Sequence, residues 1–174
     1  EGAQAASRLA AMGFTEQYGQ TSIEQVLKIA GSRDLSPFSS GAGRLFDAVS
    51  ALLGVCDRNT FEGEAAIALE ALTVEDINDE YPVVLTKENE YTVLDFCDAI
   101  NAMIDDLLKY DPKPVIATRF HNTLASAIRS SVKGIHERTG IVDVALSGGT
   151  FQNSYLLART IAQLAADGMM VHTN

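Results

Sequence analysis

The segment Ser147-Gly148-Gly149-Thr150 has residue types and a spacing that could bind an anion. It follows the apolar run of residues 141–146 and precedes a helical pattern over residues 153–166. Two adjacent glycines permit positive φ angles and let a ligand approach the backbone without meeting a Cβ. The unpaired N–H groups and the positive dipole end of a following helix suit a phosphate. Because the segment matches neither a Walker loop nor the Gly-x-Gly-x-x-Gly pattern, it indicates either a phosphate loop or an ordinary strand-to-helix turn.

Asp47 is a second residue that could bind a ligand, since it lies near the start of an apolar helical pattern over residues 44–53. A carboxylate on the first turn of a helix is stabilised by the helix dipole, and its oxygens can accept hydrogen bonds from ribose hydroxyls. The same carboxylate could also serve only the helix. Arg44 lies three positions earlier, the spacing of an ion pair along a helix. For Arg44 we favour this structural role over contact with a phosphate.

The histidines and cysteines do not form a metal-binding pattern. The three histidines, His121, His136 and His172, are far apart and lack ligand spacing. Cys56 and Cys97 each lie in an apolar helical pattern without a second cysteine nearby. We therefore expect no metal site, no catalytic residue and two buried, reduced thiols.

Composition limits the class of protein. The chain has 174 residues, 47% of them hydrophobic, which is enough to form a core without disulfides. Its net charge of −10 opposes nucleic acid and anionic membranes, and no run of eighteen apolar residues or secretion signal is present. We expect a cytoplasmic protein that binds neither nucleic acid nor membrane. Because the first residue is Glu, we also expect either a piece of a longer chain or a processed chain.

Periodicity predicts a mainly helical part over residues 1–140 and a strand, glycine loop, helix and strand over residues 141–174, together one incomplete domain. A hairpin is expected near residues 82–94, around the polar turn of residues 87–90. Residues 141–146 and 169–173 are expected to be parallel neighbours joined by a right-handed crossover. Helices are expected over residues 3–12, 23–29 with Thr21 or Ser22 as N-cap, 44–53, 61–72, 95–108, 115–138 and 153–166.

Four blocks of sequence together resemble the carbamoyltransferase HypF family. They are residues 39–54 around Gly43-Arg44-Leu45-Phe46-Asp47, residues 61–72, residues 119–125, and residues 146–153. Their order and spacing match the family across residues 36–174. The first helical segment resembles the family only in character.

The resemblance implies an α/β fold, a partial actin/Hsp70-like (ASKHA) nucleotide-binding lobe with large helical insertions and a small mixed sheet. ATP binds between two lobes in that family. The acidic residue beside the nucleoside turn has three candidates, Glu62, Glu64 and Glu70, whereas Ala68 stands where a carboxylate would be expected. The residues implied to contact nucleotide are Asp47, Gly63, Glu64, Gly148, Gly149 and Asn153.

The implied activity is ATP-dependent transfer of a carbamoyl group through carbamoyl adenylate to the C-terminal cysteine of a partner, HypE. This reaction begins the synthesis of the cyanide ligands of nickel-iron hydrogenase. The family's histidine pair and Asp-Gly-Gly turn, which bind its metal, do not occur here, so the metal site is expected outside this chain, which alone should be inactive. Alternatives are a TsaD-like tRNA threonylcarbamoyl transferase, which the negative charge disfavours, a small-molecule O-carbamoyltransferase, and a non-catalytic helical interaction module.

Overall fold

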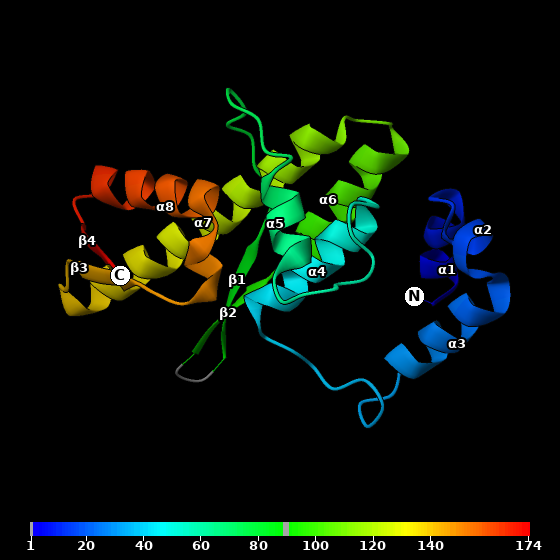
Figure 1. The fold of residues 1–174 in the computed structure, drawn as a ribbon. Helices are drawn as coiled ribbons and strands as arrows, with labels where there is room; N and C mark the ends of the chain where they lie inside the picture. The colour runs from blue at the N-terminus through cyan, green and yellow to red at the C-terminus, as the bar shows by residue number, and fades with distance from the viewer. Residues whose placement is uncertain (1, 89–90) are drawn as a thin grey trace.

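The computed structural model describes residues 2–88 and 91–174 (Figure 1). The tip of the expected hairpin, Asn89 and Glu90, lies outside these residues. The strands are β1 (Val84–Glu88), β2 (Tyr91–Asp95), β3 (Asp143–Leu146) and β4 (Met170–Thr173). The helices are α1 (Gly2–Ala11), α2 (Phe14–Tyr18), α3 (Gln20–Ala30), α4 (Ala42–Leu52), α5 (Glu64–Glu70), α6 (Cys97–Leu108), α7 (Lys113–Thr139) and α8 (Ser154–Ala166), with the 3-10 helix η1 (Gly149–Gln152).

Both expected strand pairs are present. β1 and β2 are antiparallel, whereas β3 and β4 are parallel with Leu146 opposite Thr173. α8 supplies the connection that a parallel pair requires, and Figure 1 shows it alongside α7 with the two strands near its end. The small sheet content was predicted correctly, but these strands form two separate two-stranded sheets.

The long helix α7 is the centre of the core. Its Phe120 packs edge to face on Phe46 of α4, with ring centroids 5.2 Å apart, and both rings are buried. Side chains from α5, α6 and α8 complete this cluster. A second cluster of Leu146, Leu164 and Met169 lies between β3, β4 and the neighbouring helices. Burial of apolar side chains on several helices therefore holds α4 to α8 together.

Buried polar side chains of α7 bind the long connection between α5 and β1. Thr118 accepts a hydrogen bond from Val74 N at 2.9 Å, and Thr123 accepts one from Tyr81 N at 2.8 Å. Asn122 donates to two carbonyls of the same connection at 2.9 and 3.1 Å. A connection without regular structure leaves backbone groups unpaired, so these side chains supply the missing partners.

Several helix ends differ from the sequence-based expectations. α3 begins at Gln20 after Gly19, so neither Thr21 nor Ser22 is its N-cap. α5 begins at Glu64 instead of residue 61, because Gly63 has a left-handed φ of 83°. α7 begins at Lys113, where the prolines were expected only to end the preceding helix. Proline in a first helical turn loses no hydrogen bond, so it opens α7 readily.

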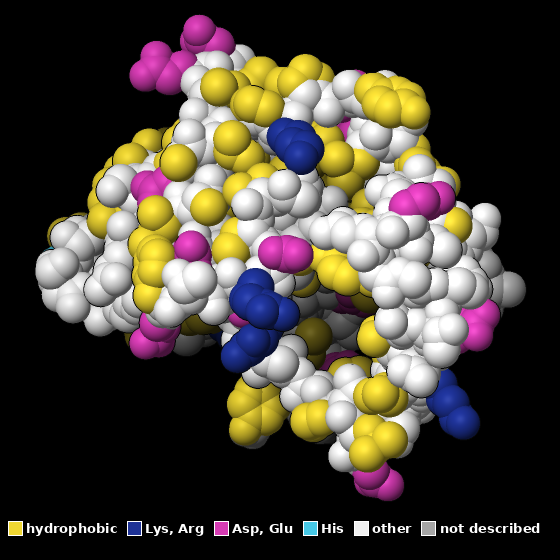
Figure 2. All heavy atoms as spheres, turned by 45° about the vertical axis from the view of Figure 1, so that its right-hand side comes forward, with side chains coloured by type: hydrophobic (Ala, Val, Ile, Leu, Met, Phe, Trp, Pro, Cys, Tyr) yellow, Lys and Arg dark blue, Asp and Glu magenta, His cyan; other side chains and the backbone are white. Residues whose placement is uncertain are grey.

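The helices α1 to α3 lie beside the core (Figure 1). Arg8 bonds to Asn101 at 2.6 Å and pairs with Asp105, while Tyr18 donates to Asp57 at 3.0 Å. Figure 2 shows a hollow on this face with hydrophobic side chains at its rim. Within the described residues, no helix is long and apolar enough to cross a membrane.

Candidate nucleotide site

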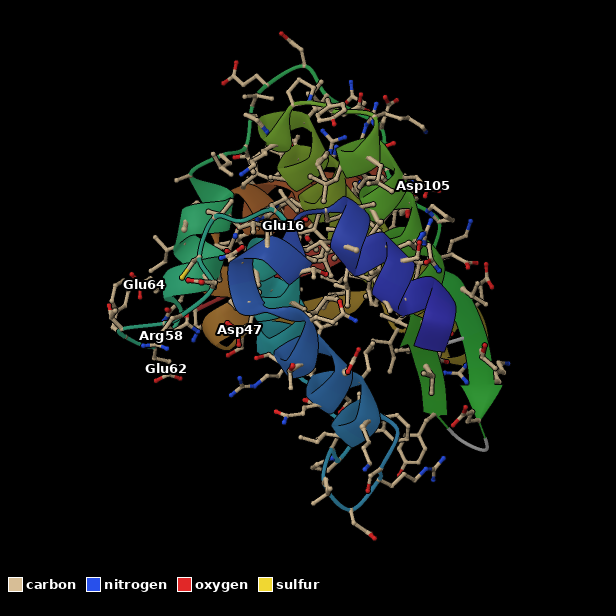
Figure 3. The ribbon with its side chains drawn as sticks, turned by 90° about the vertical axis from the view of Figure 1, so that its right-hand side faces the viewer. Glu16, Asp47, Arg58, Glu62, Glu64 and Asp105 are labelled. Atoms are coloured by element: carbon tan, nitrogen blue, oxygen red, sulfur yellow. The ribbon has the colours of Figure 1, made fainter. Side chains whose placement is uncertain are left out.

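The first part of the candidate site is an exposed edge formed by α4 and the start of α5, here called the carboxylate edge: Asp47, Asn59, Gly63 and Glu64. Figure 3 shows Asp47 and Glu64 toward the same side of the molecule, with Glu62 and Arg58 near them. Asn59 connects the two helices, because its Nδ2 donates to Asp47 at 2.9 Å and its Oδ1 accepts from Ala65 N at 3.1 Å. Two residues predicted from separate sequence blocks are therefore neighbours.

Asp47 lies in the second turn of α4, not the first as predicted, because α4 begins at Ala42. The helix dipole therefore contributes less to its carboxylate than expected. Arg44 pairs with Asp47 at 3.3 Å, which confirms the structural role favoured for this arginine. The Asp47 side chain retains 32% of its exposure, so its carboxylate remains accessible to a ligand.

Glu64 begins α5, and its carboxylate bonds back to the turn before the helix. It accepts hydrogen bonds from Thr60 N and, at 2.9 Å, from Thr60 Oγ1. The backbone N–H of Thr60, and then its hydroxyl, hold the pKa of Glu64 below its ordinary value. Glu64 therefore stays ionised beside Gly63. Of the other two acidic candidates, Glu62 lies near the same edge, whereas Glu70 is at the opposite end of α5.

The second part of the candidate site is the glycine loop, residues 147–153. Gly148 has a φ of 98°, which only glycine adopts without strain. The φ of Gly149 lies outside this left-handed region. A Cβ added at Gly149 would meet no heavy atom within 4 Å, so this position faces open space. The loop runs into η1 before α8 begins.

The first amides of α8 are already bonded, contrary to the expectation of unpaired donors. Glu70 accepts hydrogen bonds from Ser154 N at 2.6 Å and Tyr155 N at 3.2 Å. Asn153 is the N-cap and accepts from Leu156 N at 2.8 Å. Glu70 lies 84 residues before Ser154, so the local sequence could not show that a carboxylate takes this position.

The loop itself keeps donors that a ligand could use. No described residue accepts the backbone N–H of Gly149 or Thr150. Asn153, by contrast, is buried, with 7% of its surface exposed. Its side chain caps α8 and contacts His121, so it positions the loop from behind instead of facing solvent.

His121 is fully buried on α7, which confirms its interpretation as a packed histidine. Its Nδ1 lies 2.7 Å from Ala117 O and its Nε2 lies 3.0 Å from Asn153 Nδ2. Burial lowers the pKa of His121, although the Ala117 carbonyl and the charge of Glu70 oppose this. The ring is therefore neutral at physiological pH.

Neither cysteine is the buried thiol that the sequence predicted. Cys97 is exposed and Cys56 is half-buried, because each lies at the end of a helix or beyond it. A hydrogen bond with Asp95 raises the pKa of Cys97, which opposes formation of a thiolate. Within residues 2–88 and 91–174, no group of three or more metal-ligating side chains comes together.

Helix α5 joins the two parts of the candidate site. Its first turn belongs to the carboxylate edge, and its last residue, Glu70, binds the start of α8 after the glycine loop. The structure thus links three of the four sequence blocks. A glycine loop before a helix can bind an anion, and accessible carboxylates can accept hydrogen bonds from hydroxyl groups.

Comparison with known proteins agrees with this arrangement. The family described as "Carbamoyltransferase, Kae1-like Domain, second subdomain" matches residues 3–174. Carbamoyltransferase HypF of Synechocystis sp. is 41% identical over 138 residues, which cover 78% of this chain and 17% of that protein. Carbamoyltransferase HypF of Rhodobacter capsulatus is 37% identical over 142 residues, again 78% of this chain and 17% of the relative.

A solved structure described as full-length HypF in the phosphate- and nucleotide-bound form superposes with a TM-score of 0.86 at 35% identity. The match covers 95% of this chain and 26% of that one. These matches confirm the α/β fold class, a partial Kae1-like lobe. The chain belongs to the carboxyl-terminal region of the carbamoyltransferase HypF family, and it spans 17% of the length of the two relatives above.

Proposed function

We propose that this chain is the part of an ATP-dependent carbamoyltransferase that holds one side of the nucleotide. The whole enzyme would pass a carbamoyl group through carbamoyl adenylate to the C-terminal cysteine of HypE, for the cyanide ligands of nickel-iron hydrogenase. The thiolate would attack the carbamoyl carbon, a C–S bond would form, and the C–O bond to the adenylate phosphate would break. The metal site and the groups that make the adenylate would lie in other parts of the protein.

In this proposal the two parts of the site contact different parts of the nucleotide. Asp47 would accept hydrogen bonds from the ribose hydroxyls, and Gly63 and Glu64 would lie beside the nucleoside. Gly148 and Gly149 would face the phosphates, where the free N–H groups at Gly149 and Thr150 can donate. Asn153 would hold the loop in place. Positioning of the adenylate, not acid–base chemistry, would be the contribution of this lobe.

The observation that carries the proposal is the continuous link through α5. Asn59 joins Asp47 to the first turn of this helix, and Glu70 joins its last turn to the residues after the glycine loop. An accidental strand-to-helix turn would need no such link to an accessible carboxylate. The similar solved structure of full-length HypF is in a phosphate- and nucleotide-bound form, which supports the same assignment.

Two substitutions in the full-length protein test the proposal. Gly149→Val should abolish ATP binding and carbamoyl transfer, because the added side chain fills the open space at the loop while the backbone conformation allows it. Asp47→Ala should weaken ATP binding by about tenfold to a hundredfold, the cost of a lost hydrogen bond to a charged group. Calorimetry measures the affinity.

Asp98→Ala is the matched control, since Asp98 is an exposed carboxylate on α6, outside both parts of the site. It should change the total charge equally and leave ATP affinity within about twofold. Unchanged ATP affinity in both folded site variants would contradict the nucleotide assignment. A separate expectation is that the isolated chain binds ATP weakly, because it forms one side of the cleft and its net charge is −10.

A further inference from the structure

The imidazole of His121 touches the glycine loop at a single polar atom. Its Nε2 lies 3.0 Å from Nδ2 of Asn153, the residue at which the loop ends and α8 begins. Both side chains are buried, so water does not compete for this contact. His121 belongs to the third sequence block and Asn153, 32 residues later, to the fourth, so the contact joins these two blocks.

The hydrogen bonds around this contact define which atoms carry protons. Asn153 Oδ1 accepts from Leu156 N, so the atom facing His121 is the amide nitrogen, a donor. The carbonyl of Ala117 can only accept, so His121 Nδ1 carries the ring proton. Nε2 must then be the acceptor. His121 is consequently the neutral Nδ1–H tautomer.

Protonation of His121 would conflict with the cap of α8. A proton on Nε2 would face the Asn153 NH2 group, placing two donors 3.0 Å apart. Rotation of the Asn153 amide would restore that contact but turn the NH2 group toward Leu156 N–H, which then loses its acceptor. Neither arrangement satisfies all the buried groups, and an unsatisfied buried group is costly.

The elements packed around His121 show why the ring is held so closely. Phe46 of α4 and Phe120 of α7 meet its ring edge to face, each with ring centroids 5.6 Å away. Tyr155 of α8 does the same, at 5.6 Å. Glu70 of α5 is the charged group that acts on it. The ring therefore has little freedom to move away from Asn153.

We propose that His121 is a positioning residue whose neutral imidazole fixes the Asn153 amide and so the glycine loop in the shape that accepts nucleotide. The inference rests on the proposed nucleotide site. ATP affinity then depends on the acceptor at His121 Nε2 and decreases when that atom is protonated. His121 contacts no substrate in this scheme, because Asn153 lies between it and the loop.

The test measures ATP affinity by calorimetry in the full-length protein at pH 8 and pH 5.5. His121→Gln places an amide oxygen where Nε2 lies and cannot take up the proton, whereas His121→Phe keeps a ring but has no acceptor. At pH 8 the Phe variant should bind ATP about tenfold more weakly and the Gln variant within about threefold of the unsubstituted protein. Between the two pH values the unsubstituted protein should lose more affinity than the Gln variant, because only its ring can take up a proton. The ratio to the Gln variant removes the titration of ATP itself.

Thr118→Val is the matched control for general destabilisation. Thr118 is buried on the same helix and hydrogen-bonds only to Pro114 O and Val74 N, away from the glycine loop. It should leave ATP affinity and its pH dependence unchanged. An equal loss in Thr118→Val and His121→Phe would overturn the proposal, as would a Gln variant with the same pH dependence as the unsubstituted protein.

Gly149→Val separates this inference from the proposed function. If Gly149→Val abolishes ATP binding while His121→Phe leaves it unchanged, only the role of His121 is wrong. If Gly149→Val also leaves ATP binding unchanged, the loop does not bind nucleotide and both proposals are wrong. Should His121→Phe fail to fold, the pH comparison with His121→Gln still decides the question.

Discussion

The two parts of the candidate site differ in how the protein holds them. The glycine loop ends in buried contacts, where Asn153, His121 and Glu70 satisfy each other and the start of α8. The carboxylate edge consists of accessible side chains that bond mainly among themselves, such as Asp47 with Arg44 and Asn59. Substitution of the buried Asn153 should therefore affect folding as well as binding, whereas substitution at the edge should affect binding alone.

This difference indicates how a nucleotide would meet the chain. A phosphate group requires fixed donors, and under the proposed function a loop that is held from behind would supply them without rearrangement. A ribose needs two acceptor oxygens within reach, which accessible carboxylates can provide after small movements. The four predictions below test the contrast between a buried, stabilising part and an accessible, binding part.

The largest expected effect is on the core beneath the loop. Phe120→Ala should lower the free energy of unfolding by about 3–5 kcal/mol, because it removes a fully buried ring that packs on Phe46 and His121. Phe61→Ala, near the carboxylate edge, should change it by less than about 1 kcal/mol, since that ring is 55% exposed. Urea unfolding of the chain measures both. Equal losses would contradict the contrast.

The second prediction compares the loss of stability with the loss of ATP binding in one variant from each part of the site. Asn153→Ala should destabilise the chain by about 1–3 kcal/mol, because Leu156 N–H loses its cap and His121 Nε2 loses its donor. Asp47→Ala should cost less than about 1 kcal/mol, since its partners are exposed. Relative to the stability that each variant loses, Asp47→Ala should weaken ATP binding more than Asn153→Ala does. Thermal unfolding and calorimetry on both variants give the ranking.

Most elements of the fold could be predicted from the sequence, because apolar periodicity is strong in α4, α6 and α8 and the β3–glycine–α8–β4 order defines a parallel pair. The expected helix over residues 61–72 was too long, since Gly63 takes a left-handed conformation that the helical pattern of the sequence does not reveal. The short α2 was missed because it contains no buried residue. Such an element leaves no apolar pattern.

The site could be predicted only in part. The assignments of Asp47, Gly63, Glu64, Gly148 and Gly149 to nucleotide remain predictions, and the structure shows only that they lie on linked elements. Asn59 was missed, although an Asn in a turn before a helix often caps it. Glu70 at the start of α8 could not have been found, because the contact spans 84 residues and depends on tertiary packing.

The third prediction uses pH to separate the two parts. The folded pKa of His121 is below the value of 6.5 in an unfolded chain, so the unfolded state binds more protons on acidification. The contribution of neutral His121 to the free energy of unfolding is complete above pH 6.5 and is lost as the pH falls toward and through the folded pKa. The loss is at most about 1.4 kcal/mol per pH unit. His121→Gln should remove this slope between pH 6.5 and pH 5.

His136→Gln is the control for that slope, because His136 is only half-buried and its ring bonds only to Ile141 O at 2.9 Å. Chemical unfolding at several pH values measures the slope for each protein. If His136→Gln removed the slope and His121→Gln did not, the buried part would not carry the pH dependence.

The smallest effect is expected for the ion pair of the carboxylate edge. Arg44 and Asp47 are 3.3 Å apart at i, i+3 on α4, and the Arg44 side chain is 78% exposed. Solvent and salt screen such a pair, so a double-mutant cycle of Arg44→Ala and Asp47→Ala should give a coupling energy of about 0.2–0.5 kcal/mol, lower still in 0.5 M salt. The ATP affinity of Arg44→Ala should at most double or halve, because the arginine is the ion-pair partner of the Asp47 carboxylate. A coupling above about 1 kcal/mol, or a tenfold loss of ATP affinity in Arg44→Ala, would show that the carboxylate edge is built as firmly as the loop or that Arg44 itself reaches the phosphates.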